Sequence, residues 1–333
     1  MKNLTTSLTS SISILFFIAI FVITPTQAAP IEIQFLHSAD KNSSKSKVAQ
    51  QFKQLLESRV SPDAVRVTLK ANKGDLAEEQ IIPAVLRGQF HIAMPDINKV
   101  TVYNKRFQLF NLPFLFVTPE AAQRFTKGVY GERMLSLLGA QGIKGLGYHY
   151  HGMKQMLANR IMTVPSMAEG LKFRTNGSQV ANAQSYSLKA QPIQIGAGNV
   201  FPALENNTVD AQENVWTTIH ANRYYQFHSH VMETNHGYSG SLVMSSKRFW
   251  DSLPGQLRIE IETALQEAIE YGNWSAKEAT DKARSAIVNN NAAIIHPVIG
   301  AARDSWMAVM LPIWSQFEDE IGSALITAAS SQR

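Results

Sequence analysis

The alternation of strand-like and helix-like segments is the feature that most constrains the fold of this chain. Apolar residues alternate from Ile31 to Phe35, recur at helical spacing from Val48 to Val60, and alternate again from Val65 to Leu69. The same succession of strands and helices returns in the middle of the chain, at 171–174, 178–189, 192–195, 199–205 and 209–212. This order predicts an α/β fold with mostly parallel strands and helices on the faces of the sheets.

The last part of the chain has a different, helical pattern. Apolar residues mark one long amphipathic helix from Leu257 to about Ile287 and a second helical stretch from Arg303 to Ala328. Pro312 lies inside the second stretch, where it predicts a kink or a break. A chain of 333 residues is too long for one simple core, so we expect two lobes, with the chain crossing between them more than once.

The N-terminus has the three regions of a secretory signal peptide. Lys2 precedes a polar stretch, the apolar run Ile12 to Ile23 and the segment "TPTQAAP", which predicts a signal peptide over residues 1–28. The apolar run is about 12 residues long, shorter than the roughly 20 of a membrane-spanning helix. An uncleaved N-terminal anchor is the alternative. The chain contains no cysteine, so an exported form has to be stable without disulfides.

The surface charge does not indicate a nucleic-acid partner. The formal net charge is +5, but the basic residues are scattered and form no cluster interleaved with aromatic residues.

Arg174 is the most informative candidate for a binding site. In "GLKFRTNGSQ" it lies at the end of a predicted strand, and the segment from Gln212 to Asn214 follows another strand. Ligands of open α/β sheets bind beyond the carboxyl ends of the strands. A guanidinium presents a planar fork that matches both oxygens of a carboxylate, which a lysine does not.

Paired histidines offer a competing hypothesis. His149 and His151 in "YHYHG" are two residues apart, and His228 and His230 in "FHSH" repeat this spacing, so on a strand each pair would share one face. Two imidazoles of this kind can begin a zinc or copper site, although such sites use three or four ligands. An exported metal-binding protein is therefore an alternative function.

Catalysis is the third possibility, and the motifs do not favour it. The segment "GYSGS" at 237–241 lacks the second glycine of a hydrolase nucleophile elbow at the required place. The chain also lacks a cysteine nucleophile and a glycine-rich phosphate loop. We therefore expect a protein that is not an enzyme and that needs no cofactor, with a hydrolase as the least favoured alternative.

Four motifs together resemble one protein family. They are "FNLPFLFVTPEAAQRF" at 110–125, "FRTNGSQVANA" at 173–183, "FPALENNTVDAQEN" at 201–214 and "TNHGYSGSLVMSSKRFWDSLP" at 234–254. In this order, and together with the flanking segments, they resemble the solute-binding subunit of TRAP transporters, the tripartite ATP-independent periplasmic systems, in its dicarboxylate-receptor family. The resemblance covers nearly the whole chain after the signal peptide.

The resemblance implies a periplasmic receptor of a Gram-negative bacterium, with a type II periplasmic-binding-protein fold. Two α/β lobes with mixed sheets would close by a hinge on an organic acid, and a long helix would contribute to both lobes. The receptor would deliver the acid to a TRAP membrane permease and would carry out no catalysis. We expect lobe I at 29–152 plus about 241–280, and lobe II at 153–240 plus about 281–333. Whether the receptor is a monomer or a dimer is left open.

The resemblance also assigns residues to the ligand site. Arg174 matches the arginine that anchors the carboxylate, and Arg160 matches a second arginine of some members, which either contacts the ligand or braces the cleft wall. Asn214 and Asp96 match positions from which the two lobes make polar contacts to the ligand. The alternative for Asn214 is a simple turn residue. Three further positions are expected to help choose the acid, which the sequence does not identify: His149, Trp216 and Ala197. The Trp216 indole either stacks on the ligand or packs within a lobe.

Overall fold

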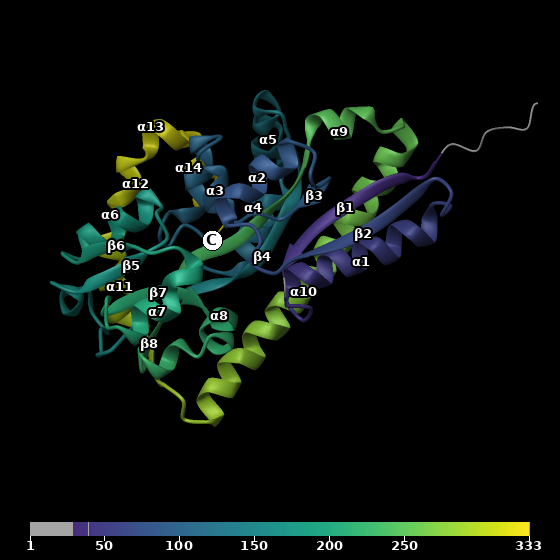
Figure 1. Cartoon of the computed structure of the whole chain (residues 1–333). Coiled ribbons are helices and arrows are strands. Elements are labelled where there is room, and N and C mark those ends of the chain that lie inside the picture. Colours follow the sequence, from purple (N-terminus) through teal and green to yellow (C-terminus); the bar gives the residue numbers. More distant parts are fainter. Residues whose placement is uncertain (1–28, 39, 333) are drawn as a thin grey trace, which may run out of the picture.

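The computed structural model describes residues 29–38 and 40–332 (Figure 1). The predicted signal peptide lies outside the described residues and stays a prediction. Among the described residues, no helix has both the length and the apolar character needed to cross a membrane.

One mixed sheet runs through the described part of the chain. Its strand order is β2-β1-β3-β8-β4-β7-β5-β6, and β9 also pairs with β8. The strands are β1 (Ile31–Ser38), β2 (Val65–Asn72), β3 (Ile92–Ala93), β4 (Ile143–Ala158), β5 (Lys172–Thr175), β6 (Gln191–Gln194), β7 (Ala211–Val215), β8 (His230–Ser246) and β9 (Ile294–Pro297).

Helices cover this sheet. The α-helices are α1 (Ser44–Arg59), α2 (Glu78–Leu86), α3 (Ile97–Val100), α4 (Pro119–Lys127), α5 (Val129–Ser136), α6 (Gln179–Ser187), α7 (Val200–Glu205), α8 (Trp216–Ala221), α9 (Lys247–Ser252), α10 (Gly255–Asn289), α11 (Gly300–Met310), α12 (Ile313–Gln316), α13 (Glu318–Ile321) and α14 (Ser323–Ser330). The 3-10 helices are η1 (Lys105–Asn111), η2 (Leu137–Gln141), η3 (Pro165–Ala168), η4 (Ala197–Asn199) and η5 (Tyr224–Gln226).

Two long antiparallel strands, β4 and β8, connect the two lobes. At one end, β3 pairs with β8, and β1 lies parallel to both β2 and β3. At the other end, β7 pairs with β4, and β5 lies parallel to both β6 and β7. Figure 1 shows these two groups of strands on opposite sides of the molecule, with β4 and β8 between them. The two-lobed α/β fold that the sequence predicts is confirmed.

The lobe boundaries expected from the sequence fall inside these long strands. Residue 152 lies within β4 and residue 240 within β8. The register between the two strands shifts between Tyr150 and Gly152, which marks a β-bulge. The backbone φ of Gly152 is 154°, a value that residues with a side chain rarely adopt. The chain therefore passes between the lobes through a bulged strand pair rather than through a loop. The assignment of each segment to a lobe remains a prediction.

The helical predictions are confirmed in outline. Strand β1, helix α1 and strand β2 form the predicted opening, and the long amphipathic helix is α10. The break expected at Pro312 lies between α11 and α12. The rest of that stretch is divided further, because Gly322, with a φ of 98°, ends α13.

The long helix α10 is packed closely against α1 at Gly272. A Cβ placed on this glycine would lie 2.2 Å from Cγ2 of Val48, a fully buried and β-branched residue. The same Cβ would lie 3.3 Å from the ring of His149. Gly272 therefore lets α10, α1 and β4 meet.

We expect Gly272→Ala to lower the free energy of unfolding by about 1–3 kcal/mol, because an extra methyl group overpacks this contact. Urea unfolding followed by circular dichroism measures the change. Gly255→Ala, in the first turn of the same helix, is the matched control, since its Cβ would meet only Arg258 at 4.0 Å. Equal stability of the two variants would contradict the close packing at Gly272.

Candidate functional site

Arg174 lies at the carboxyl end of β5 and is only 7 % exposed. Its Nε and one terminal nitrogen donate hydrogen bonds to the Ile195 carbonyl, at 2.9 and 2.8 Å. Within the described residues, no carboxylate forms an ion pair with its guanidinium. Burial lowers the pKa of Arg174 from its usual value, and the charge of Glu213 partly offsets this. The arginine is thus a buried cation held in place by a backbone carbonyl.

Two polar side chains of the neighbouring strand β7 lie beside Arg174 on the sheet. Gln212 is its register partner on β7 and is fully buried, and no partner for its Nε2 is found in the part of the chain that the structure describes. Asn214, two residues further, is half-buried, and its Nδ2 lies 3.5 Å from Oε1 of Gln212. Because side chains alternate along a strand, these three residues share one face near the carboxyl ends of β5 and β7. Asn214 thus lies on the same face as Arg174, and a ligand contact of Asn214 stays a prediction.

Lys154, which the sequence analysis missed, supplies a second cation. Its Nζ lies 2.6 Å from Oε1 of Glu213, and Nε2 of His236 lies 2.8 Å from the other carboxylate oxygen. Burial raises the pKa of Glu213, but Lys154 and His236 outweigh it, so that the pKa lies well below its usual value. Glu213 is therefore a buried, ionised group with two partners of its own. The segment "GMKQ" contains Lys154 as a single basic residue in a strand, and nothing in its sequence predicts a role for this lysine in the site.

Asp96 belongs to a polar group in the other lobe. It follows β3, at the start of α3, and its Oδ1 accepts a hydrogen bond of 3.0 Å from Nζ of Lys45. Glu78 lies 3.9 Å from the same nitrogen. The pKa of Glu78 is raised, mainly by burial, whereas burial raises that of Asp96 but the charge of Lys45 and its hydrogen bond outweigh this and lower it. Sequence reasoning found Asp96 but not its lysine partner.

His149 is enclosed by structural partners. Its side chain is fully buried, Nδ1 lies 3.0 Å from Oδ1 of Asn273 on α10, and Nε2 lies 2.9 Å from Oγ of Ser44 on α1. Burial lowers the pKa of His149 to about 4, so the ring is neutral near pH 7. These contacts join β4 to both helices, and a ligand contact of His149 stays a prediction.

Trp216 and Ala197 also follow the carboxyl ends of strands. Trp216 begins α8 directly after β7, but its indole is 2 % exposed and packs among Leu157, Ile219 and Ile287. The structure thus shows the packing alternative for this residue. Ala197 follows β6, is exposed, and lies two residues after the carbonyl that Arg174 binds.

Arg160 lies just beyond the end of β4. It is exposed, and Ala158 at that end of β4 pairs with Ala211 at the start of β7. Arg174 pairs with Gln212, the neighbour of Ala211, so both arginines lie toward the same end of β7. Whether Arg160 contacts the ligand or braces the cleft wall stays a prediction.

The histidine pairs do not assemble a metal centre. Within residues 29–38 and 40–332, no group of three or more possible metal ligands is present. Nε2 of His151 lies 2.9 Å from Oγ of Ser241, and Nδ1 of His230 lies 2.9 Å from Nε2 of His296. His228 instead contacts the Val209 carbonyl. The metal-binding alternative is therefore not favoured.

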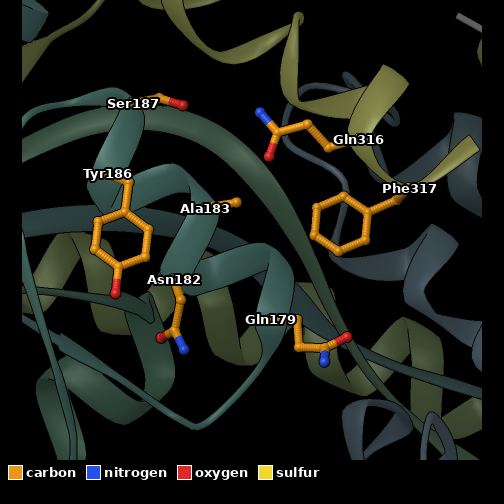
Figure 2. Close-up of a pocket in the computed structure, with 7 residues that line it drawn as sticks. All are labelled: Gln179, Asn182, Ala183, Tyr186, Ser187, Gln316 and Phe317. Carbon is orange, nitrogen blue, oxygen red and sulfur yellow. The ribbon is translucent and has the colours of Figure 1, made fainter.

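Two hollows lie on either side of α6. A very small cavity of about 10 Å³ is lined by Arg174 and Glu213, by Met156, and by the inward side of α6. A larger, open groove of about 620 Å³ lies between the outer side of α6 and the C-terminal segment. Figure 2 shows the α6 side chains, among them Tyr186 and Asn182, on one side of this groove and Gln316 and Phe317 on the other. The groove holds no charged lining residue, so Arg174 marks the better candidate site.

Comparisons with known proteins agree on one family. Residues 35–320 match the model of "Bacterial extracellular solute-binding protein, family 7". A C4-dicarboxylate-binding periplasmic protein of Shewanella loihica is 36 % identical over 91 % of this chain and 90 % of its own. A similarly named protein of Rhodobacter capsulatus is 32 % identical over 92 % of both chains.

Solved structures give the same result. A TRAP periplasmic solute-binding protein of Shewanella oneidensis with bound succinate has a TM-score of 0.86 and 36 % identity, over 91 % of this chain and 99 % of its own. A protein of the same kind from Pseudomonas aeruginosa with bound L-malate has a TM-score of 0.82 and 30 % identity, over 86 % of this chain and 100 % of its own.

Proposed function

The chain belongs to the bacterial extracellular solute-binding protein family 7, and from this membership we propose that it captures a small organic acid of the C4-dicarboxylate class. The acid would bind between the lobes, which would then close on it by a hinge motion. The receptor would work outside the cytoplasmic membrane and deliver the acid to a TRAP-type permease. It would bind its ligand without changing it chemically.

The observation that carries this proposal is the buried guanidinium of Arg174. A buried charge without a counterion is costly, and the described residues give Arg174 only a backbone carbonyl as hydrogen-bond partner. A ligand carboxylate would neutralise the charge and use the fork geometry of the guanidinium. The neighbouring amides of Gln212 and Asn214 offer further donors to the same group.

The class of acid is supported by the relatives and by the local charge. The relatives named above are C4-dicarboxylate-binding proteins, and two of the similar structures hold succinate and L-malate. In this lobe, Arg174 and Lys154 are two cations around the single carboxylate of Glu213. This excess of positive charge favours an anionic ligand.

The proposal is tested by identifying the ligand directly. We expect protein purified from the expression host and then denatured to release a small carboxylic acid, detected by mass spectrometry. Calorimetric titration of the refolded, ligand-free protein should then give saturable binding of C4-dicarboxylates. If the protein bound zinc or copper and showed no binding of a panel of organic acids, the proposal would be contradicted and a metal-binding function would be favoured.

A further inference from the structure

The Lys45 cluster, formed by Lys45, Asp96 and Glu78, is a second polar group that faces the carboxyl ends of strands. Lys45 is in the first turn of α1, after β1, and Asp96 directly precedes α3, after β3. The lysine side chain is 18 % exposed and those of Asp96 and Glu78 are 42 % and 31 % exposed. Since β1 and β3 are parallel, the cluster lies on the binding edge of its lobe.

The cluster is close to the Arg174 site along β4. Asp96 forms a β-bridge with Ser241, whose hydroxyl lies 2.9 Å from His151 on β4. Only three residues later on that strand, Lys154 binds Glu213, whose charge acts on Arg174. Three residues of a strand span about 10 Å, and Arg174 lies two strands further across the sheet, on β5, so a ligand on Arg174 meets the cluster only when the lobes close.

The charges of the cluster do not suit a second carboxylate. One ammonium group faces two carboxyl groups, and the adjacent His151 is neutral, because burial and the charge of Lys45 hold its pKa well below the usual value. A ligand carboxylate placed here would be attracted by Lys45 but repelled by Asp96. A hydroxyl group, in contrast, can donate to the carboxylate and accept from the ammonium at the same time.

We propose that the Lys45 cluster recognises a hydroxyl group of the ligand, so that the receptor prefers a hydroxylated C4 acid over succinate. This inference rests on the proposed function, since it assumes that the ligand's carboxylates bind in the lobe that contains Arg174 and Lys154. Asp96 accepts a hydrogen bond from the hydroxyl group, and Lys45 donates one to the hydroxyl oxygen. The ion pair between them holds both groups in place before the ligand arrives.

Succinate and malate test this directly, because they differ only by one hydroxyl group. Calorimetric titration of the ligand-free protein should show that one enantiomer of malate binds about 10 to 100 times more tightly than succinate, as expected for a hydrogen bond to a charged group. Asp96→Ala and Lys45→Met should each bring this ratio close to one by weakening malate binding. Asp96→Ala should leave succinate binding unchanged or tighter, since it removes a repulsive charge.

Three results separate the possibilities. If succinate binds as tightly as both enantiomers of malate, the hydroxyl inference fails and the proposed function stands. If Lys45→Met weakens succinate as much as malate, the lysine binds a carboxylate and the inference is likewise overturned. If no organic acid binds the wild-type protein, both fail. Lys70→Gln, an exposed lysine of β2, is the control for a lost positive charge, and circular dichroism confirms that each variant is folded.

Discussion

Arg174→Ala abolishes organic-acid binding in calorimetric titration while the protein stays folded. The guanidinium is the buried cation nearest the proposed carboxylate position, and removing it leaves a desolvated carboxylate without its partner. Such a loss costs about 3–5 kcal/mol. This corresponds to roughly two to four orders of magnitude in affinity. The fold should tolerate the change, because no carboxylate of the described residues depends on Arg174 for an ion pair.

Two further variants make this result specific. Arg174→Lys keeps the charge but loses the fork, so we expect affinity between those of the wild type and the alanine variant. Arg133→Ala removes an exposed arginine of α5 and should leave binding unchanged. Affinity close to the wild-type value in Arg174→Ala, with an unchanged circular dichroism spectrum, would show that the ligand does not use this arginine.

Much of the fold was predictable because its signals are local. The alternation of Ile31, Ile33 and Phe35 reports a strand with one buried face, and the spacing along α10 reports a helix with one buried stripe. Such patterns depend only on neighbours in the sequence. The carboxyl end of β5 could be located in the same way, and with it Arg174.

The long strands and the partners of the site residues could not be predicted in this way. Strands β4 and β8 are buried over much of their length and bulged, so apolar and polar residues do not alternate regularly along them. Lys45 pairs with Asp96, 51 residues away, and Lys154 pairs with Glu213, 59 residues away. No local pattern records such pairs.

Lys154 is the residue whose loss we expect to destabilise the fold most clearly. The Lys154 and Glu213 side chains are only 13 % and 10 % exposed, so Lys154→Met leaves a carboxylate buried with His236 as its remaining partner. Removing one partner of a buried ion pair lowers the free energy of unfolding by about 3–5 kcal/mol. We expect a loss of this size at pH 7 in urea unfolding of the ligand-free protein.

The pH dependence distinguishes a charge effect from a packing effect. In the wild type, the lowered pKa of Glu213 adds stability above the unfolded value of 4.5, and this stability is lost as the pH falls toward the folded pKa. In Lys154→Met, burial raises the pKa of Glu213, so the carboxyl group becomes neutral in acid and the difference between the two proteins should shrink as the pH falls from 7 to about 4.

A double variant completes the comparison. Lys154→Met with Glu213→Gln removes both charges, and we expect it to be more stable at pH 7 than Lys154→Met alone, because no unpaired buried charge is left. Equal losses at pH 7 and pH 4, with additive effects of the two substitutions, would instead mean that Lys154 stabilises the fold by packing its aliphatic stem. Cδ of that stem lies 3.0 Å from the point that a Cβ on Gly237 would occupy, so the stem covers this glycine of β8 closely.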